Sequence, residues 1–210
     1  MPHVALLGDS IFDNRSYVGA GPDVIAQLRQ ALGAGWAATL LARDGDRIGG
    51  VPQQLRRLPA DVTHLVVSVG GNDALGYSGV LNLGTPTIAE ALLRLASVSA
   101  EFEDSYAAML DGLSATGLRL AVCTIYDPAY PDAVRQRAAA TALKVLNDPI
   151  LRLAAERGLP VIELRLVCRS PEDYANPIEP SVQGGRRIAA AIAGLLRHHA
   201  FETGRSTIYL

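Results

Sequence analysis

Short apolar segments alternate along the chain with longer segments in which apolar residues recur at helical spacing. Five short segments are nearly continuous in apolar character, as expected of strands buried on both faces: residues 4–7, 37–42, 64–69, 119–125 and 160–164. The spacing predicts helices over 23–32, 85–114 and 133–157, with Pro149 as a kink or interruption, and a last helix after an N-cap at Ser181. This alternation is typical of a parallel sheet covered by helices on both faces.

Five β-α units predict one three-layer α/β/α sandwich around a five-stranded parallel sheet. We expect residues 1–200 to form the domain, because no repeat or flexible linker divides them. Residues 201–210 form a C-terminal tail with an apolar end at Ile208, Tyr209 and Leu210. Three options stay open for this tail: it packs on the domain, packs on a neighbouring molecule, or frays.

Composition narrows the classes of partner. The chain has 210 residues, of which 49% are hydrophobic and 19% charged, so it has ample material for a continuous core. The net charge is −2, and basic residues occur in pairs such as Arg56-Arg57 and Arg186-Arg187 rather than in stripes. This pattern gives no indication of nucleic acid or anionic membrane as a partner, and it favours a small molecule.

Cysteine usage and the N-terminus indicate the compartment. Cys123 and Cys168 have no metal-binding spacing and are expected to be buried thiols. The N-terminus lacks the pattern of a signal peptide. The longest strongly apolar stretch, residues 188–196, is far shorter than the roughly 20 residues of a membrane span. We therefore expect a soluble cytoplasmic protein.

The loops that follow the predicted strands carry the candidate chemistry, because ligands of open parallel sheets bind beyond the carboxyl ends of the strands. The first such loop begins Gly8-Asp9-Ser10, and a serine at such a turn can act as a nucleophile. The third is Gly-Gly-Asn-Asp over residues 70–73, in which Asn72 offers an amide donor to an oxyanion. The second loop contributes Gly45 and its backbone N–H.

These motifs resemble those of the SGNH (GDSL-type) hydrolase family. G-D-S at residues 8–10, Gly45, G-G-N-D at 70–73 and P-S-x-x-G-G-x-x-I-A at 180–189 occur in the family's order along nearly the whole chain. The resemblance implies a flavodoxin-like fold and hydrolysis of esters, thioesters or acetylated sugars. It implies Ser10 as nucleophile, an oxyanion hole from the Ser10 N–H, the Gly45 N–H and Asn72, and no metal or organic cofactor.

The chain departs from the family at the partners of the serine. The family pattern D-x-x-H before Pro-Ser is replaced here, with Asn176 in the place of Asp and Glu179 in the place of His. The four histidines give no substitute. His3 and His64 lie at the starts of predicted strands, on the edge opposite Ser10, and His198 and His199 end the last helix.

Glu179 is therefore the candidate base, with Asn176 orienting its carboxylate as a neutral hydrogen-bond donor. An ordinary glutamate has a pKa of about 4.3 against about 6.5 for histidine, a gap of about 3 kcal/mol in proton affinity. Burial beside other acidic residues raises such a pKa. Five acidic residues share the strand-end loops: Asp13, Asp44, Asp46, Asp73 and Asp127.

The sequence predicts an esterase for small carboxylic esters or acetylated substrates, with two alternatives. The first is a catalytically impaired protein of the same fold that binds an acyl or sugar ligand. The second is a divalent metal site at Asp13, Asp127 and Glu179. Tyr77, Tyr126 and Tyr130 are candidates for an aromatic wall of the pocket, and Arg15 and Tyr17 for substrate contacts. The lack of a long insertion favours short acyl groups.

Overall fold

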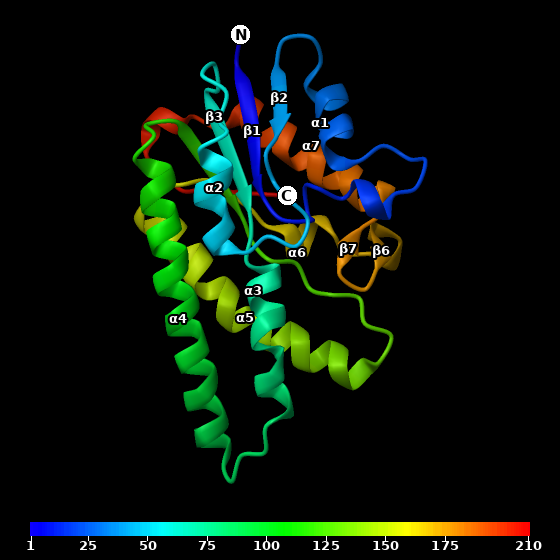
Figure 1. Ribbon diagram of the computed structural model, residues 1–210, viewed down its shortest axis with the longest axis vertical. Coiled ribbons are helices and arrows are strands. Elements are labelled where there is room, and N and C mark those ends of the chain that lie inside the picture. The colour runs from blue at the N-terminus through cyan, green and yellow to red at the C-terminus, as the bar shows by residue number, and fades with distance from the viewer.

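The sheet has six parallel strands rather than the five predicted. A computed structural model describes residues 1–210, and its strands follow the order β2-β1-β3-β4-β5-β8 (Figure 1). Their bounds are β1 His3–Gly8, β2 Ala37–Leu40, β3 His64–Ser68, β4 Arg119–Cys123, β5 Val161–Ile162 and β8 Ile208–Tyr209. The α/β sandwich with a parallel sheet is confirmed.

The sixth strand comes from the C-terminal tail. Val161 N–H donates to Thr207 O at 2.9 Å, and Glu163 N–H donates to Tyr209 O at 2.9 Å. The tail thus packs on the domain as an edge strand. A two-residue strand after a polar segment carries no alternating pattern, which is why periodicity did not reveal it.

Helices cover both faces of the sheet. On one face, α1 Val24–Leu32 packs against α7 Val182–His198 over a core of 24 buried residues. On the other face, α2 Val51–Leu55, α4 Ile88–Ser114 and α5 Ala133–Glu156 cover a second core of 21 buried residues. Both cysteines are buried and free, as predicted. None of the helices combines the length and apolar character that crossing a bilayer requires.

The sequence places the helix starts well because side chains cap them. The predicted N-cap Ser181 accepts hydrogen bonds from Gln183 N–H and Gly184 N–H. Asp23 caps α1, Thr87 caps α4 and Asp132 caps α5 in the same way.

Pro149 does not interrupt α5, which is one continuous element. Proline lacks the N–H that would bond to the carbonyl four residues earlier, which is Val145 O. Ser99 of α4 donates its hydroxyl to that carbonyl at 3.2 Å. A side chain from the neighbouring helix therefore satisfies the group that the proline leaves free.

The shorter elements gather around the carboxyl ends of the strands or connect the larger ones. They are α3 Gly71–Tyr77, α6 Leu164–Val167, the antiparallel pair β6 Tyr174–Asn176 and β7 Glu179–Pro180, and five 3-10 turns at Arg15–Tyr17, Ile48–Gly50, Ser78–Asn82, Pro171–Asp173 and Phe201–Thr203. The first half of α4 extends beyond the sheet beside α3 and the turn that follows it (Figure 1). This extension exposes Leu81, Leu83, Ile88, Leu92 and Leu93.

Position 8, at the end of β1, requires glycine both because a side chain would clash there and because its backbone conformation is left-handed. Its φ is +125°, and a Cβ added there would lie 1.7 Å from Ser68 O.

We predict that Gly8→Ala lowers the free energy of unfolding by more than about 3 kcal/mol, because the strand must move and the backbone is strained. Gly117→Ala, at φ +69° with no atom within 4 Å of the added Cβ, serves as control. It should cost only about 1–2 kcal/mol in urea unfolding, and equal losses in the two variants would contradict the steric argument.

Candidate active site

Ser10 lies in a tight turn directly after β1. Asp9 N–H donates to Ser68 O of β3 at 3.1 Å, and Asp9 Oδ1 accepts from Ile11 N–H at 3.1 Å. These bonds hold the turn on both sides of the serine. Ser10 is buried, with 6% of its surface exposed, and it lines an apolar pocket.

Glu179, at the start of β7, reaches Ser10 from the other end of the chain. Ser10 Oγ donates to Glu179 Oε1 at 3.1 Å, a bond between residues 169 positions apart. The glutamate is also buried, and its second oxygen, Oε2, has no hydrogen-bond partner. The structure therefore brings together the serine and the acid that the sequence singled out.

Two side chains hold the backbone on either side of Glu179. Tyr126 donates its hydroxyl to Ile178 O at 2.7 Å, and Asn14 donates its amide to Pro180 O at 3.1 Å. Asn14 is fully buried, and its oxygen accepts from Val24 N–H at 2.9 Å. The position of the carboxyl group thus depends on α1 and on the loop after β4.

Asn176 does not orient Glu179 in the way the sequence suggested. Its side chain is exposed, and Asn176 Oδ1 accepts from Ile178 N–H at 3.0 Å in a local turn. No hydrogen bond joins the Asn176 amide to the Glu179 carboxyl group. The short polar side chain stabilises the reversal between β6 and β7 instead, which is a common role of asparagine in turns.

Burial raises the pKa of two acids at this site. Burial is the main cause that raises the pKa of Glu179 to about 7; the Ser10 hydrogen bond opposes the shift and the charge of Asp44 adds to it. Burial raises the pKa of Asp9 to about 8, against the bond from Ile11 N–H and with repulsion from Glu179 and Asp73. Glu179 therefore changes its protonation state near neutral pH.

The three predicted oxyanion donors are placed differently. Asn72, in the first turn of α3, lines the pocket and donates one amide hydrogen to Asp46 O at 2.9 Å, which leaves its second hydrogen free. The backbone N–H groups of Ser10 and Gly45 have no partner within the chain. Gly45, at φ +80°, does not line the pocket itself. It directly precedes Asp46, whose carbonyl oxygen accepts from the Asn72 amide.

The pocket continues from Ser10 between α3, α4 and α5. Of its 26 lining residues 18 are hydrophobic, among them Leu75, Leu81, Val98, Ala142 and Leu146. All three tyrosines proposed as an aromatic wall, Tyr77, Tyr126 and Tyr130, line it. The pocket is more extended and apolar than the absence of a long insertion suggested, because the helical extension supplies its walls.

Two further predicted contacts are absent from the pocket. Tyr17 donates its hydroxyl to Asp44 Oδ2 at 2.7 Å, and the Arg15 guanidinium donates to Gly21 O at 2.8 Å. Both side chains stabilise the loop between β1 and α1. Neither lines the pocket.

No histidine lines the pocket, in agreement with the sequence. His3 bonds to Thr39, and His64 bonds to Thr63, both at the amino ends of their strands. Burial lowers the pKa of His64 to about 4. His198 is exposed at the end of α7, and His199 lies against Tyr209 of β8.

Three of the five acids of the strand-end loops accept hydrogen bonds from backbone or side-chain amide groups. Asp13 accepts from Asp44 N–H at 2.9 Å, Asp46 from the Gln54 amide at 2.7 Å and Asp73 from Ile48 N–H at 3.1 Å. No three side chains of His, Cys, Asp or Glu lie close enough together to hold a metal ion. The metal alternative at Asp13, Asp127 and Glu179 therefore has no support in the geometry.

Two residues that support the site were not recognised as such from the sequence. Asn14 lies in the loop after the serine, where no local pattern sets it apart. Gln54 is buried in α2, where its amide accepts from Gly8 N–H at 2.8 Å and donates to Gly8 O at 2.7 Å. A glutamine that pairs with the backbone of a residue 46 positions away leaves no local pattern.

Comparison with known proteins shows the family of the chain. A sequence model of the GDSL-like Lipase/Acylhydrolase family matches residues 6–187, so the chain belongs to that family. The chain matches none of the curated proteins with which it was compared.

Solved structures share the fold at low sequence identity. An extracellular lipase from Streptomyces rimosus superposes with a TM-score of 0.65 at 18% identity, covering 92% of this chain and 98% of the lipase. A lipolytic G-D-S-L family protein from Veillonella parvula gives 0.68 at 16% identity, covering 94% and 98% of the two chains. A lipase/acylhydrolase from Enterococcus faecalis gives 0.62 at 20% identity, covering 94% and 96%.

The raised pKa of Glu179 predicts how stability depends on pH. Between about pH 5 and 7 the folded protein retains a proton on Glu179 that the unfolded chain has released, so the free energy of unfolding falls as the pH rises, by up to about 3 kcal/mol. Asp9 extends the fall toward pH 8. In Glu179→Gln, urea unfolding at pH 5, 6, 7 and 8 should show a smaller fall. The exposed Glu172→Gln should follow the wild type, and an unchanged fall in Glu179→Gln would contradict the assignment.

Proposed function

We propose that the protein is a serine esterase in which Ser10 is the nucleophile and Glu179 the general base. The observation that carries this proposal is the hydrogen bond from Ser10 Oγ to a buried carboxyl group whose pKa is raised to about 7. A base with a pKa near the working pH combines a useful deprotonated fraction with a strong tendency to accept a proton. The raised pKa offsets the disadvantage of an ordinary glutamate relative to histidine.

The proposed reaction has two halves with one proton shuttle. The Glu179 carboxylate takes the proton of Ser10 Oγ as that oxygen attacks the ester carbonyl carbon, which forms a tetrahedral intermediate. As the ester C–O bond breaks, Glu179 returns the proton to the departing alcohol and an acyl-serine remains. Glu179 then takes a proton from a water that attacks the acyl-serine, and it gives that proton back to Ser10 as the free acid leaves.

The negative oxygen of the tetrahedral intermediate needs donors that the protein does not already use. The Ser10 N–H, the Gly45 N–H and the second hydrogen of the Asn72 amide meet this condition. We assign the oxyanion hole to these three groups. Asn14 and Tyr126 are positioning residues, because they act on the backbone beside Glu179. We place no catalytic role on Asn176, whose amide serves a local turn.

A second candidate function is a ligand-binding protein without turnover. The unpartnered Oε2 of Glu179 favours it, since in a complete triad a third group orients the base. The two proposals differ in whether Ser10 becomes covalently modified, and the following experiment separates them.

For the esterase, we predict that hydrolysis of a p-nitrophenyl ester rises with pH around a midpoint near 7 in the wild type, because Glu179 must lose its proton. Glu179→Gln should lower kcat by about 10²- to 10⁴-fold, and Ser10→Ala should leave only the residual rate due to binding. Glu172→Gln is the matched control and should keep the wild-type rate. A fluorophosphonate probe should label the wild type and not Ser10→Ala. Absence of labelling between pH 4 and 9 would favour the binding protein.

The apolar pocket supports an acyl chain longer than acetyl as the substrate group. Ala142 is half-buried and lines the pocket from α5, a helix that carries neither Ser10 nor Glu179. Ala142→Trp should lower kcat/KM for an octanoyl ester by about tenfold or more while acetyl ester hydrolysis changes little, since the larger side chain fills space that only the long chain uses. An equal loss for both esters would mean that the variant disturbs Ser10 rather than the acyl site.

A further inference from the structure

A second hollow lies beside the active site, and its lining is the opposite of the apolar pocket. It has a volume of about 340 Å³ and seven lining residues, none of them hydrophobic. Three of the seven are arginines: Arg43 from the loop after β2, and Arg56 and Arg57 from the end of α2. The pair Arg56-Arg57 is one that the sequence already set apart.

The three arginines have no partner of opposite charge. None of them forms an ion pair or a side-chain hydrogen bond, although eight ion pairs occur elsewhere in the protein. The only carboxylate in the lining is Asp46, which accepts from the Gln54 amide at 2.7 Å. The hollow thus carries a net charge of +2 in a chain whose formal net charge is −2. Guanidinium groups with free donors are the groups that bind phosphate and carboxylate oxygens.

The floor of the hollow is rigid and is part of the catalytic framework. Gln54 is 1% exposed; its amide oxygen accepts from Gly8 N–H, and its amide nitrogen donates to Gly8 O and to the Asp46 carboxylate. Asp46 in turn holds the Asn72 amide through its carbonyl oxygen. The same two residues therefore support the hollow, the turn before Ser10 and one oxyanion donor.

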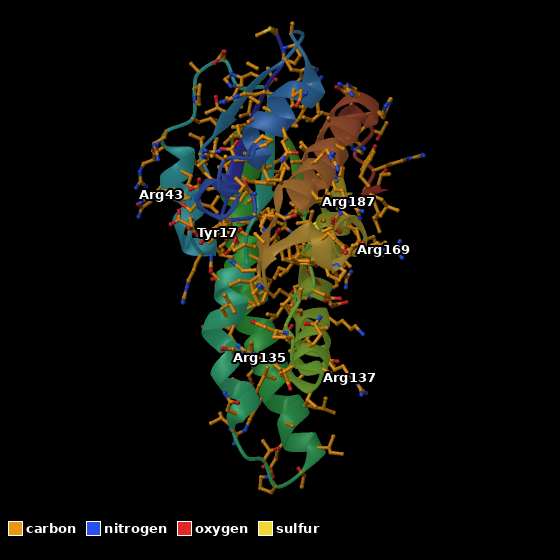
Figure 2. All side chains as sticks on the ribbon, turned by 90° about the vertical axis from the view of Figure 1, so that its right-hand side faces the viewer. Tyr17, Arg43, Arg135, Arg137, Arg169 and Arg187 are labelled. Atoms are coloured by element: carbon orange, nitrogen blue, oxygen red, sulfur yellow. The ribbon has the colours of Figure 1, made fainter.

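Strand order places the two hollows on opposite sides of Ser10. Along the carboxyl edge of the sheet, Arg43 follows β2, Ser10 follows β1, and the apolar pocket begins with Gly71 and Asn72 after β3. Figure 2 shows Arg43 beside α2, on the other side of the molecule from Arg169. By this order, an ester held at Ser10 with its acyl group in the apolar pocket would extend its alcohol side toward the loop after β2, which carries Arg43.

We propose that Arg43, Arg56 and Arg57 form an anion site that binds a phosphate group on the alcohol part of the substrate. The claim that the substrate is an ester rests on the proposed esterase function. The claim that the hollow binds an anion rests on the three arginines alone. It assigns the substrate class as an acyl ester of a phosphorylated alcohol. The site selects the substrate through KM, because the arginines lie away from the reacting atoms.

The test uses two esters that differ only in the phosphate, 1-octanoylglycerol and 1-octanoylglycerol 3-phosphate. The wild type should have a KM at least tenfold lower for the phosphorylated ester. Each of Arg43→Gln, Arg56→Gln and Arg57→Gln should raise that KM by about fivefold with kcat unchanged, as expected for loss of an exposed charge contact. The KM for the neutral ester should not change. Arg169→Gln, an exposed arginine whose side chain has no partner, is the matched control and should leave both constants unchanged.

A binding measurement separates failure of this inference from failure of the proposed function. Calorimetric titration of glycerol 3-phosphate and of inorganic phosphate into Ser10→Ala requires no turnover. Binding that is lost in the triple arginine variant supports the anion site even if neither ester is hydrolysed, in which case only the esterase function fails. Hydrolysis of both esters with equal KM, together with binding of inorganic phosphate, would overturn the substrate assignment in favour of a free anion. If neither glycerol 3-phosphate nor inorganic phosphate binds and the two esters have the same KM, the anion site is contradicted.

Discussion

The hydrogen bond between Ser10 and Glu179 depends on most of the fold. Its donor stands at the end of the first strand and its acceptor just before the last helix, so the bond forms only when α7 is packed against α1 and both lie on the sheet. Asn14 connects the same parts, since it bonds both to the first residue of α1 and to the backbone beside Glu179. The site is therefore a consequence of tertiary packing, and local unfolding of either helix would separate its two central groups.

Burial of the Glu179 carboxyl group raises its pKa as the proposed mechanism requires, and it also carries a cost. A glutamate in water is too weak a base for a serine hydroxyl, and removal from water brings its pKa close to that of histidine. The folded protein must then hold a partly ionised group with one oxygen unpartnered, which destabilises it above neutral pH. Asp9, buried next to Ser10 with a similarly raised pKa, adds to this cost while its hydrogen bonds shape the serine turn. In the proposed mechanism, the raised pKa of Glu179 therefore favours reactivity and lowers stability.

The sequence predicted those parts of the fold and site that leave a local pattern. Apolar strands, capped helix starts and small or polar residues at strand ends are all short-range signals, and they pointed to Ser10 and Asn72. Glu179 was reached through the resemblance to the family. All three residues line one pocket. The errors concern long-range pairing. The sixth strand pairs a tail with β5, Gln54 bonds to Gly8, and Ser99 satisfies the carbonyl freed by Pro149. Asn176 was misjudged for a different reason. The resemblance to the family suggested that its side chain orients Glu179, whereas Asn176 Oδ1 accepts from Ile178 N–H in a local turn.

The acidic residues of the strand-end loops show how one residue type serves two purposes at this edge of the sheet. Asp13, Asp46 and Asp73 accept hydrogen bonds from backbone or amide groups, which fixes the loops. Glu179 accepts one hydrogen bond from a hydroxyl that is itself a candidate reactant, and it retains an open oxygen. The difference lies in the kind of donor and in the second oxygen of Glu179, which is buried without a partner. A carboxylate becomes a candidate base here because its surroundings leave its hydrogen-bonding capacity unfilled while keeping water away.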